Sequence, residues 1–249
     1  MSRLGTNQFN IFRILDYFIL FSKPFGLQVG DMNLCCQARR SFLSSSLSFT
    51  PFFYVPGLMA EALTSTPKQT EGPFYPNRLP LDTDNDLIII NDSLTPAVGT
   101  IAYLSGKVTD LKGNPLRNTL VEIWQVDSNG IYLHSNGGPR EKWDSNFQGY
   151  GRFLTNTRGE YFFRTLKPTL YSGRTPHIHM AVSAKGKEKL TTQCYVQGEP
   201  RNKNDFILSR IKDRKARNSL VVPFTPLKDS KLGEVVARFD IVLGWTPVD

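Results

Sequence analysis

The chain has 249 residues, 40% of them hydrophobic, which suffices for one sizeable core and gives little ground for two. Lys and Arg outnumber Asp and Glu by 30 to 22, but this surplus is spread along the chain rather than gathered in an arm, which argues against a nucleic-acid partner. The three cysteines, Cys35, Cys36 and Cys194, lack the spacing of a zinc site and exclude a disulfide framework.

The first 62 residues have the features of an N-terminal extension with an export signal. Arg39 and Arg40 form a twin-arginine pair, and a moderately apolar stretch rich in Ser and Phe continues to Leu58. The stretch ends in Ala60-Glu61-Ala62, a small-x-small pattern typical of signal-peptidase sites. We therefore expect this extension over 1–62 and one globular domain over 63–249.

The alternative for this segment is an ordinary basic pair in front of a buried helix. Pro51 and Pro56 argue against it, because proline interrupts a helix interior. Residues 1–31 show no clear globular pattern, which suggests Met32 as the working start. We expect export by the twin-arginine route to the periplasm or beyond the cell, a mature chain from near Leu63, and no stable membrane insertion after export.

From Pro67 onward, short apolar runs alternate with turn signals such as those at 110–115 and 127–130. This succession predicts an antiparallel sandwich or barrel of about eight strands, with one short helix over Asp205–Arg217. The expected strands are Thr100–Val108, Leu120–Val126, Tyr150–Thr155, Tyr161–Leu166, His177–Ser183, Leu190–Val196, Leu220–Phe224 and Val236–Leu243.

Two of the three histidines form His177-Ile178-His179 within one of these runs. Side chains two apart in a strand share a face, so both imidazoles point the same way. Two neutral imidazoles on one rigid face make half of a metal site. The pattern also occurs on polar strand faces, so the pair alone is a weak signal.

Two tyrosines beside turn signals are candidates to complete such a site. Tyr171 precedes Gly173 and Pro176, which favour a turn that folds it back over the histidine face, and Tyr132 follows the turn at Gly130. Phenolate is a hard oxygen ligand suited to ferric iron, and a bound cation would lower a tyrosine pKa far below its free value of about 10. A single tyrosine is more often a half-buried aromatic with a hydrogen-bonded hydroxyl.

The segments around these residues resemble the intradiol ring-cleavage dioxygenases, the family of protocatechuate and catechol dioxygenases. The resemblance is carried by VEIWQVDSNGIY at 121–132, RTPHIH at 174–179, TTQCY at 191–195 and RFDIVL at 238–243. It extends over roughly residues 68 to 245, which makes the domain at 63–249 similar to the catalytic domain of these enzymes. The resemblance implies an antiparallel β-sandwich with long active-site loops. The combined motifs are highly specific.

This resemblance implies one iron(III) per chain, held by Tyr132, Tyr171, His177 and His179 with a solvent hydroxide as the fifth ligand. Tyr171 would be the axial ligand that leaves when substrate chelates the metal. The implied reaction cleaves a catechol-type ring between its two hydroxyls with O2 and gives a cis,cis-muconate.

The resemblance also implies roles for residues that do not bind the metal. Arg174 would stabilise negative charge on the ring, and Gln193 would line the same pocket. The segment TEGPFY at 70–75 is similar to the family's N-terminal pocket segment, which makes Thr70, Gly72 and Pro73 candidates for substrate binding.

Two departures from the family pattern leave the substrate open. Only five residues separate Tyr171 from His177, where the protocatechuate and catechol enzymes have a longer insert that shapes the pocket. The chain also lacks the long helical N-terminal dimerisation region of catechol dioxygenases, so a homo-oligomer is neither implied nor excluded.

Two other functions fit parts of this pattern. An exported β-sandwich that binds an aromatic or sugar ligand without catalysis would have at least one metal ligand misplaced. A cupin-like enzyme would hold ferrous iron with His177, His179 and a carboxylate, and would leave both tyrosines as packing residues.

Overall fold

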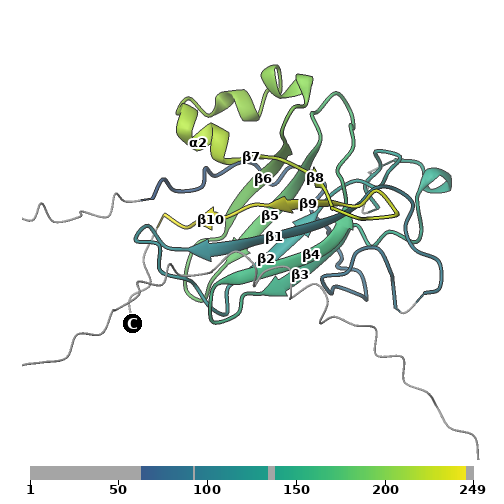
Figure 1. Ribbon diagram of the computed structural model, residues 1–249, viewed down its shortest axis with the longest axis horizontal. Coiled ribbons are helices and arrows are strands. Elements are labelled where there is room, and N and C mark those ends of the chain that lie inside the picture. The colour runs from purple at the N-terminus through teal and green to yellow at the C-terminus, as the bar shows by residue number, and fades with distance from the viewer. Residues whose placement is uncertain (1–62, 92, 134–137, 245–249) are drawn as a thin grey trace, which may run out of the picture. The chain divides into compact units, whose positions relative to one another are not determined.

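The computed structural model describes residues 63–91, 93–133 and 138–244, and the predicted export signal lies outside them. In this part of the chain, short strands form two five-stranded sheets, which appear as two layers in Figure 1. The first sheet has the order β10-β1-β9-β8 with β4 also on β1, and consists of β1 (Ile101–Thr109), β4 (Glu160–Leu166), β8 (Thr225–Pro226), β9 (Val235–Arg238) and β10 (Ile241–Val242). The second has the order β3-β2-β5-β6-β7, and consists of β2 (Leu120–Trp124), β3 (Tyr150–Leu154), β5 (His177–Ser183), β6 (Leu190–Val196) and β7 (Val221–Val222).

The β-sandwich is confirmed, but its sheets are mixed rather than antiparallel. Strand β1 pairs in parallel with β9 and β10, and β6 pairs in parallel with β7. A parallel pair needs a long crossover, and residues 197–220 supply one between β6 and β7. The run expected as one strand over Val236–Leu243 divides into β9 and β10 around 239–240, and β8 has no counterpart in the prediction.

The single helix expected over Asp205–Arg217 is wrong in its extent. A 3-10 turn spans Leu208–Arg210, and α2 spans only Arg214–Ser219. The Asp213 side chain accepts from Ala216 N at 2.7 Å and starts α2, whereas Asp205 accepts from backbone N–H groups of the earlier turn. Two aspartates that each begin their own turn therefore divide the segment.

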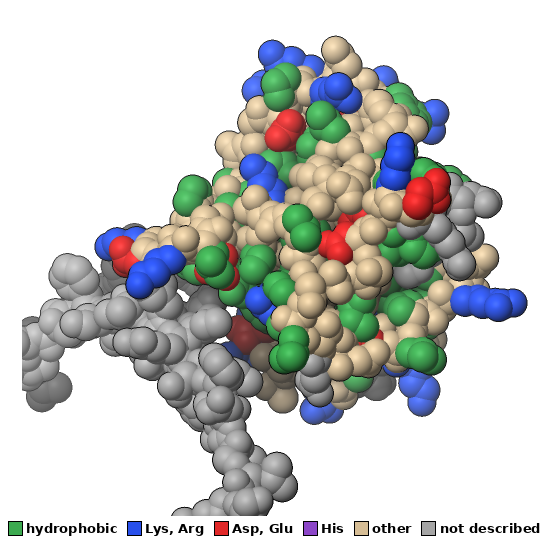
Figure 2. Space-filling view, turned by 90° about the vertical axis from the view of Figure 1, so that its right-hand side faces the viewer, with side chains coloured by type: hydrophobic (Ala, Val, Ile, Leu, Met, Phe, Trp, Pro, Cys, Tyr) green, Lys and Arg blue, Asp and Glu red, His purple; other side chains and the backbone are tan. Residues whose placement is uncertain are grey.

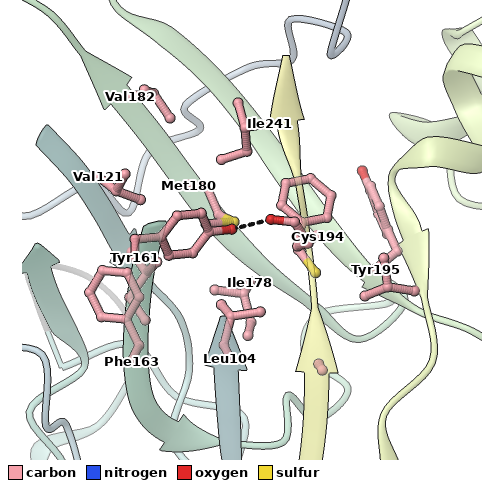
Figure 3. Packing of buried hydrophobic residues seen from close by; sticks show 14 of the residues in the cluster. Leu104, Val121, Tyr161, Phe163, Ile178, Met180, Val182, Cys194, Tyr195 and Ile241 are labelled. Atoms are coloured by element: carbon pink, nitrogen blue, oxygen red, sulfur yellow. Dashed lines mark hydrogen bonds between the residues drawn. The ribbon is translucent and has the colours of Figure 1, made fainter. Parts of the chain in front are cut away.

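One core lies between the sheets. Leu104 of β1 and Phe163 of β4 meet Ile178, Met180 and Cys194 of the second sheet (Figure 3), and all five are fully buried. Burial raises the pKa of the Cys194 thiol well above its usual value, so this cysteine behaves as a small apolar side chain.

Strand β5 separates this core from a second face. Ile178, Met180 and Val182 point into the core, so His177 and His179 lie on the opposite face of the sheet. That face carries a separate aromatic cluster containing Trp124, with residues of loops that cross over it. The fold thus presents both histidines away from the sandwich interior and beneath a cover of loops.

Among the described residues, no helix is long and apolar enough to cross a bilayer. Lys and Arg side chains are spread over the face shown in Figure 2 rather than forming a stripe.

Candidate metal centre

His177 and His179 lie close together and almost fully buried on β5. Their exposed fractions are 3% and 2%, and their Nε2 atoms are 3.2 Å apart. The regular two-residue repeat of the strand produces this geometry, as the sequence predicts. Both rings turn the same nitrogen toward one point.

Both imidazoles are held in the neutral form. Burial, with the nearby Arg174 charge, lowers the pKa of His177 to about 4. Burial likewise lowers the pKa of His179 well below its usual value, with further contributions from His177 and Arg174. A neutral imidazole is the form that binds a metal ion.

The hydrogen bonds of the two rings point to a cation between them. His177 Nδ1 lies 2.6 Å from Thr175 O, which can only accept, so Nδ1 carries the hydrogen and Nε2 keeps a lone pair. If His179 donates from Nε2 to that lone pair, its own buried Nδ1 has no partner. In the other tautomer two lone pairs face each other. A metal ion that accepts both Nε2 lone pairs removes their repulsion, whereas His179 Nδ1 is without a hydrogen-bond partner among the described residues in either tautomer.

The two predicted tyrosines complete a cluster of four rings. Tyr132 is buried, and its ring lies 5.0 Å from that of Tyr171 and 6.1 Å from that of His179. The Tyr171 ring lies 5.7 Å from that of His177. The structure therefore brings all four predicted ligands together.

Local turns place the tyrosines. Arg174 N donates to Tyr171 O at 2.8 Å and closes a turn in which Ser172 and Gly173 have positive φ angles of 43° and 79°. This turn folds partly exposed Tyr171 back over the strand that follows, as the sequence predicts. Upstream of Tyr132, the Asp127 carboxylate accepts from Ile131 N at 3.0 Å and holds the turn through Gly130.

The donor set fits ferric iron. Burial, with a contribution from the Tyr171 hydroxyl, raises the pKa of Tyr132 well above its usual value, so a phenolate there needs a cation beside it. Hard phenolate oxygens and imidazole nitrogens together suit iron(III). Among the described residues no group of three His, Cys, Asp or Glu gathers, so the site depends on its tyrosines.

The segment at 70–75 covers the cluster. Phe74 stacks on Tyr132 with ring centroids 4.5 Å apart and 6° between the planes. A Cβ at Gly72 would lie 3.7 Å from His179 Cε1, so this glycine lies against the second histidine. Thr70 contributes its carbonyl, which accepts from Gln193 Nε2 at 3.3 Å. Pro73 is exposed, and no contact among the described residues ties it to the four rings.

A buried carboxylate anchors this cover. Tyr75 donates to Glu122 Oε1 at 2.8 Å, and Tyr150 donates to the same oxygen at 2.5 Å. Burial and the Glu122 carboxylate raise the pKa of Tyr75 to about 12, so its hydroxyl stays protonated and keeps donating. The segment at 70–75 is therefore tied to β2 and β3.

Arg174 and Gln193 lie together beneath the same site. Arg174 is only 5% exposed, which rules out a surface arginine in the turn. Its Nη2 donates to Gln193 Oε1 at 2.8 Å, and its Nε donates to Asp205 Oδ2 at 2.7 Å. The guanidinium charge is close enough to lower the pKa of both histidines.

Three residues near the site were not predicted from the sequence. Trp124 stacks on His179 with centroids 5.0 Å apart, Tyr195 donates to Gln193 Oε1 at 2.9 Å, and Asp205 pairs with Arg174. Trp124 and Tyr195 stand opposite His179 and His177 in the strand register, so a correct strand pairing would have found them. Asp205 has no such signal, because it reaches the site from an irregular segment.

Comparison with known proteins gives one family. A family model described as Dioxygenase matches residues 70–244. The beta chain of protocatechuate 3,4-dioxygenase from Burkholderia cepacia is 35% identical over 155 residues, which cover 59% of this chain and 65% of the relative. Hydroxyquinol 1,2-dioxygenase from Corynebacterium glutamicum is 29% identical over 202 residues, which cover 72% of this chain and 64% of the relative. The match thus spans less than two thirds of either relative.

Solved structures agree with this similarity. The dioxygenase domain of a dioxygenase carbohydrate-binding protein fusion from Streptomyces sp. SirexAA-E is 30% identical, with a TM-score of 0.56 over 74% of this chain and 100% of that domain. Catechol 1,2-dioxygenase from Acinetobacter sp. ADP1 is 27% identical, with a TM-score of 0.56 over 74% of this chain and 66% of the other.

Proposed function

Because the chain belongs to the family of intradiol ring-cleavage dioxygenases, we propose that it cleaves a catechol-type ring between its two hydroxyls with O2. One iron(III), held by Tyr132, Tyr171, His177 and His179, would be the cofactor. The observation that carries the proposal is the cluster of two buried, neutral imidazoles and two phenols with a guanidinium beside it. The product would be a cis,cis-muconate that contains both oxygen atoms of O2.

The metal and the protein divide the work. When bound, ferric iron would draw electron density from a coordinated catecholate and make the ring reactive toward dioxygen. Tyr171 would be the partly exposed one of the four residues that hold the metal, on a turn of its own, and its Oη would take a proton from a substrate hydroxyl. Tyr132 is buried beneath Phe74 and suits a permanent ligand.

The residues around the four ligands would offset charge on the substrate ring and exclude water. Arg174 offsets negative charge that builds on the ring, and a preorganised donor in a dry site is worth about 3 kcal/mol of barrier. Phe74 and Trp124 flank the ligand rings and exclude water from them, which strengthens the effect of that charge. Gln193 lies beside Arg174, with its oxygen fixed by Arg174 and Tyr195 and its nitrogen donating to Thr70 O.

The cupin-like function finds no support in this geometry. It needs a carboxylate with the two histidines, and among the described residues no group of three His, Cys, Asp or Glu gathers. It also leaves the tyrosines as packing residues, whereas both rings lie within 6.1 Å of a histidine ring.

Purified protein loaded with iron tests the proposal. We expect about one iron per chain, a red-brown colour from phenolate-to-iron(III) charge transfer, and one O2 consumed for each muconate formed from a catechol. Tyr132→Phe and Tyr171→Phe should each weaken or shift the band. Tyr103→Phe is the matched control, because Tyr103 donates to Glu234 in the other sheet. A colourless protein at full iron loading, or one that retains no iron, would contradict the four-ligand site.

The substrate and the location in the cell are part of the same proposal. Only residues 172–176 join Tyr171 to His177, so the pocket wall on that side is short, and a panel of 4-substituted catechols would show which are accepted. Export by the twin-arginine route follows from the pattern at 39–62 alone.

A further inference from the structure

Arg174 is half of a buried ion pair whose other half is Asp205. Arg174 Nε donates to Asp205 Oδ2 at 2.7 Å, and Nη2 donates to Oδ1 at 3.2 Å. The two side chains are 6% and 0% exposed. Two parallel hydrogen bonds fix the plane of a guanidinium as well as its distance.

The Asp205 carboxylate is itself held by the backbone. Its Oδ1 accepts from Ile207 N at 3.1 Å and from Leu208 N at 3.0 Å, and its Oδ2 accepts from Thr175 N at 3.4 Å. The hydrogen bonds from Arg174 and the backbone outweigh the effect of burial and keep the pKa of Asp205 below its usual value. The carboxylate is therefore a charged, fixed reference point rather than a side chain that follows the arginine.

The arginine in turn helps to fix a pocket residue. Arg174 Nη2 and Tyr195 Oη both donate to Gln193 Oε1, at 2.8 Å and 2.9 Å. The exposed Phe206 ring, next in the chain after Asp205, lies 5.2 Å from the guanidinium carbon. An arginine without its carboxylate would regain several side-chain rotations, and would no longer be aimed at one place.

We infer that Asp205 is a positioning residue, which holds the guanidinium plane of Arg174 at the site and affects turnover only through that arginine. The inference rests on the proposed function. It assigns a catalytic consequence to a residue of the segment between β6 and β7 whose side chain bonds to Arg174 and to backbone N–H groups rather than to the four ligands.

Asp205→Asn separates the two tasks of this carboxylate. The asparagine Oδ1 can still accept from Ile207 N and Leu208 N, so the turn at 207–210 keeps its cap. The new amide nitrogen faces Arg174 Nε, donor against donor, which breaks the stronger of the two bonds. We expect kcat to fall by about tenfold to a hundredfold, while anaerobic catechol binding and the charge-transfer band stay close to those of the parent.

A double-mutant cycle shows whether the effect passes through the arginine. In an Arg174→Ala background, Asp205→Asn should lower kcat no further. An equal loss in both backgrounds would overturn the inference, because Asp205 would then act by another route. The double variant also removes the unpaired buried charge, which guards against a single variant that fails to fold.

Asp86→Asn is the matched control. Asp86 likewise accepts from a backbone N–H, that of Ile88 at 3.0 Å, and pairs with Arg164 at 2.9 Å, away from the four rings. Its asparagine variant should leave kcat within about twofold. A fall as large as that of Asp205→Asn would attribute the effect to general loosening of the fold.

A measurement without turnover separates this inference from the proposed function. In protein loaded with gallium(III), which is diamagnetic, the NMR signal of the Arg174 Nε–H should be protected from exchange and absent from Arg174→Lys. Asp205→Asn should remove that protection. If the Arg174 Nε–H stays protected in Asp205→Asn, or if Asp205→Asn loses this protection and still turns over fully, the positioning role is overturned. An unaltered iron-loaded protein without turnover would instead remove the proposed function, whatever the NMR signal shows.

Discussion

At the scale of single residues, Arg174 combines burial with a full charge next to two uncharged histidines. Its guanidinium is 5% exposed and lowers the pKa of His177 and His179. A buried cation beside a metal site would be unfavourable without its Asp205 partner, and it becomes useful when a bound ring carries negative charge. The residue is thus placed to act on chemistry more than on binding.

Arg174→Ala should retain iron, colour and catechol chelation, and should lose about 2 to 4 kcal/mol of barrier lowering, some tens to several hundredfold in rate. Anaerobic titration with catechol measures the shift of the charge-transfer band. Muconate formation is then followed after O2 is admitted. Arg158→Ala is the control, because Arg158 lies exposed in a surface pair with Glu160. Parent-like turnover in Arg174→Ala would mean that the arginine does not act on the ring. Failure to chelate would make its role structural, as a support for the loop between Tyr171 and His177.

The same ion pair predicts a pH dependence of stability. Burial opposes ionisation of Asp205, but the hydrogen bonds from Arg174, Leu208 and Thr175 outweigh it, so its folded pKa lies below the ordinary value of 3.8. A lowered carboxyl pKa stabilises the fold above about pH 4, and this stabilisation is lost as the pH falls through the folded pKa. Urea unfolding of Asp205→Asn should therefore show a deficit at pH 7 that shrinks below pH 4. A deficit that is constant down to pH 2 would contradict the assignment.

At the scale of elements, Phe239, which lies between β9 and β10, packs closely against β1 and β4. A Cβ at Gly106 of β1 would lie 1.9 Å from Phe239 O, and the Tyr161 hydroxyl donates to the same carbonyl (Figure 3). The residue that follows β9 is thus drawn onto β1 before β10 begins. This contact explains why the apolar run over Val236–Leu243 forms two strands, β9 and β10, instead of one.

Gly106→Ala should lower the free energy of unfolding by about 1 to 3 kcal/mol or more, because the clash is with backbone and cannot be relieved by a rotamer change. Gly244→Ala is the control, since the nearest atom to its Cβ would be Ser65 Cβ at an ordinary 3.7 Å. Urea or thermal unfolding of both variants measures the difference. Equal stability of the two would show that β1 and 239 can move apart at little cost.

The sequence predicts the bounds of some strands but not the direction in which strands pair. Strands β5 and β6 have the predicted bounds, because each is a continuous run of buried residues that neighbouring positions in the sequence already mark. The parallel pairs β6–β7 and β1–β9 depend on long crossovers, and no local pattern reports their direction.

The candidate site likewise has residues that the sequence predicts and residues that only the fold reveals. Each of the four ligands lies in a motif of a few residues, and turns at Gly130 and Gly173 bring them into reach. The roles given to them rest on family resemblance. The partners Asp205 and Tyr195 are fixed by tertiary contacts between separate segments, so their part in the site became visible only with the fold.

At the scale of the whole molecule, the site exists only when the second sheet has assembled. Tyr132 follows β2, Tyr171 precedes β5 and the histidines lie on β5, so residues from 132 to 179 must meet before a metal can be held. With the proposed iron bound, metal binding and folding would be coupled, because the unfolded chain has no such site. If the chain is exported as proposed, a route that carries folded proteins would let it take up its metal before it crosses the membrane.

This coupling gives a reason for the twin-arginine pattern at Arg39 and Arg40, which lies outside the described residues. Arg39→Lys/Arg40→Lys should leave folded, iron-loaded precursor in the cytoplasm, because the lysine pair keeps the charge but loses the paired guanidinium groups. Cell fractionation with an assay for muconate formation in each fraction measures the distribution. Tyr103→Phe in the globular domain serves as a control for expression. Unchanged activity in the periplasm of the double-lysine variant would exclude this route, and a variant that is inactive in every fraction would show that the arginines matter for folding instead.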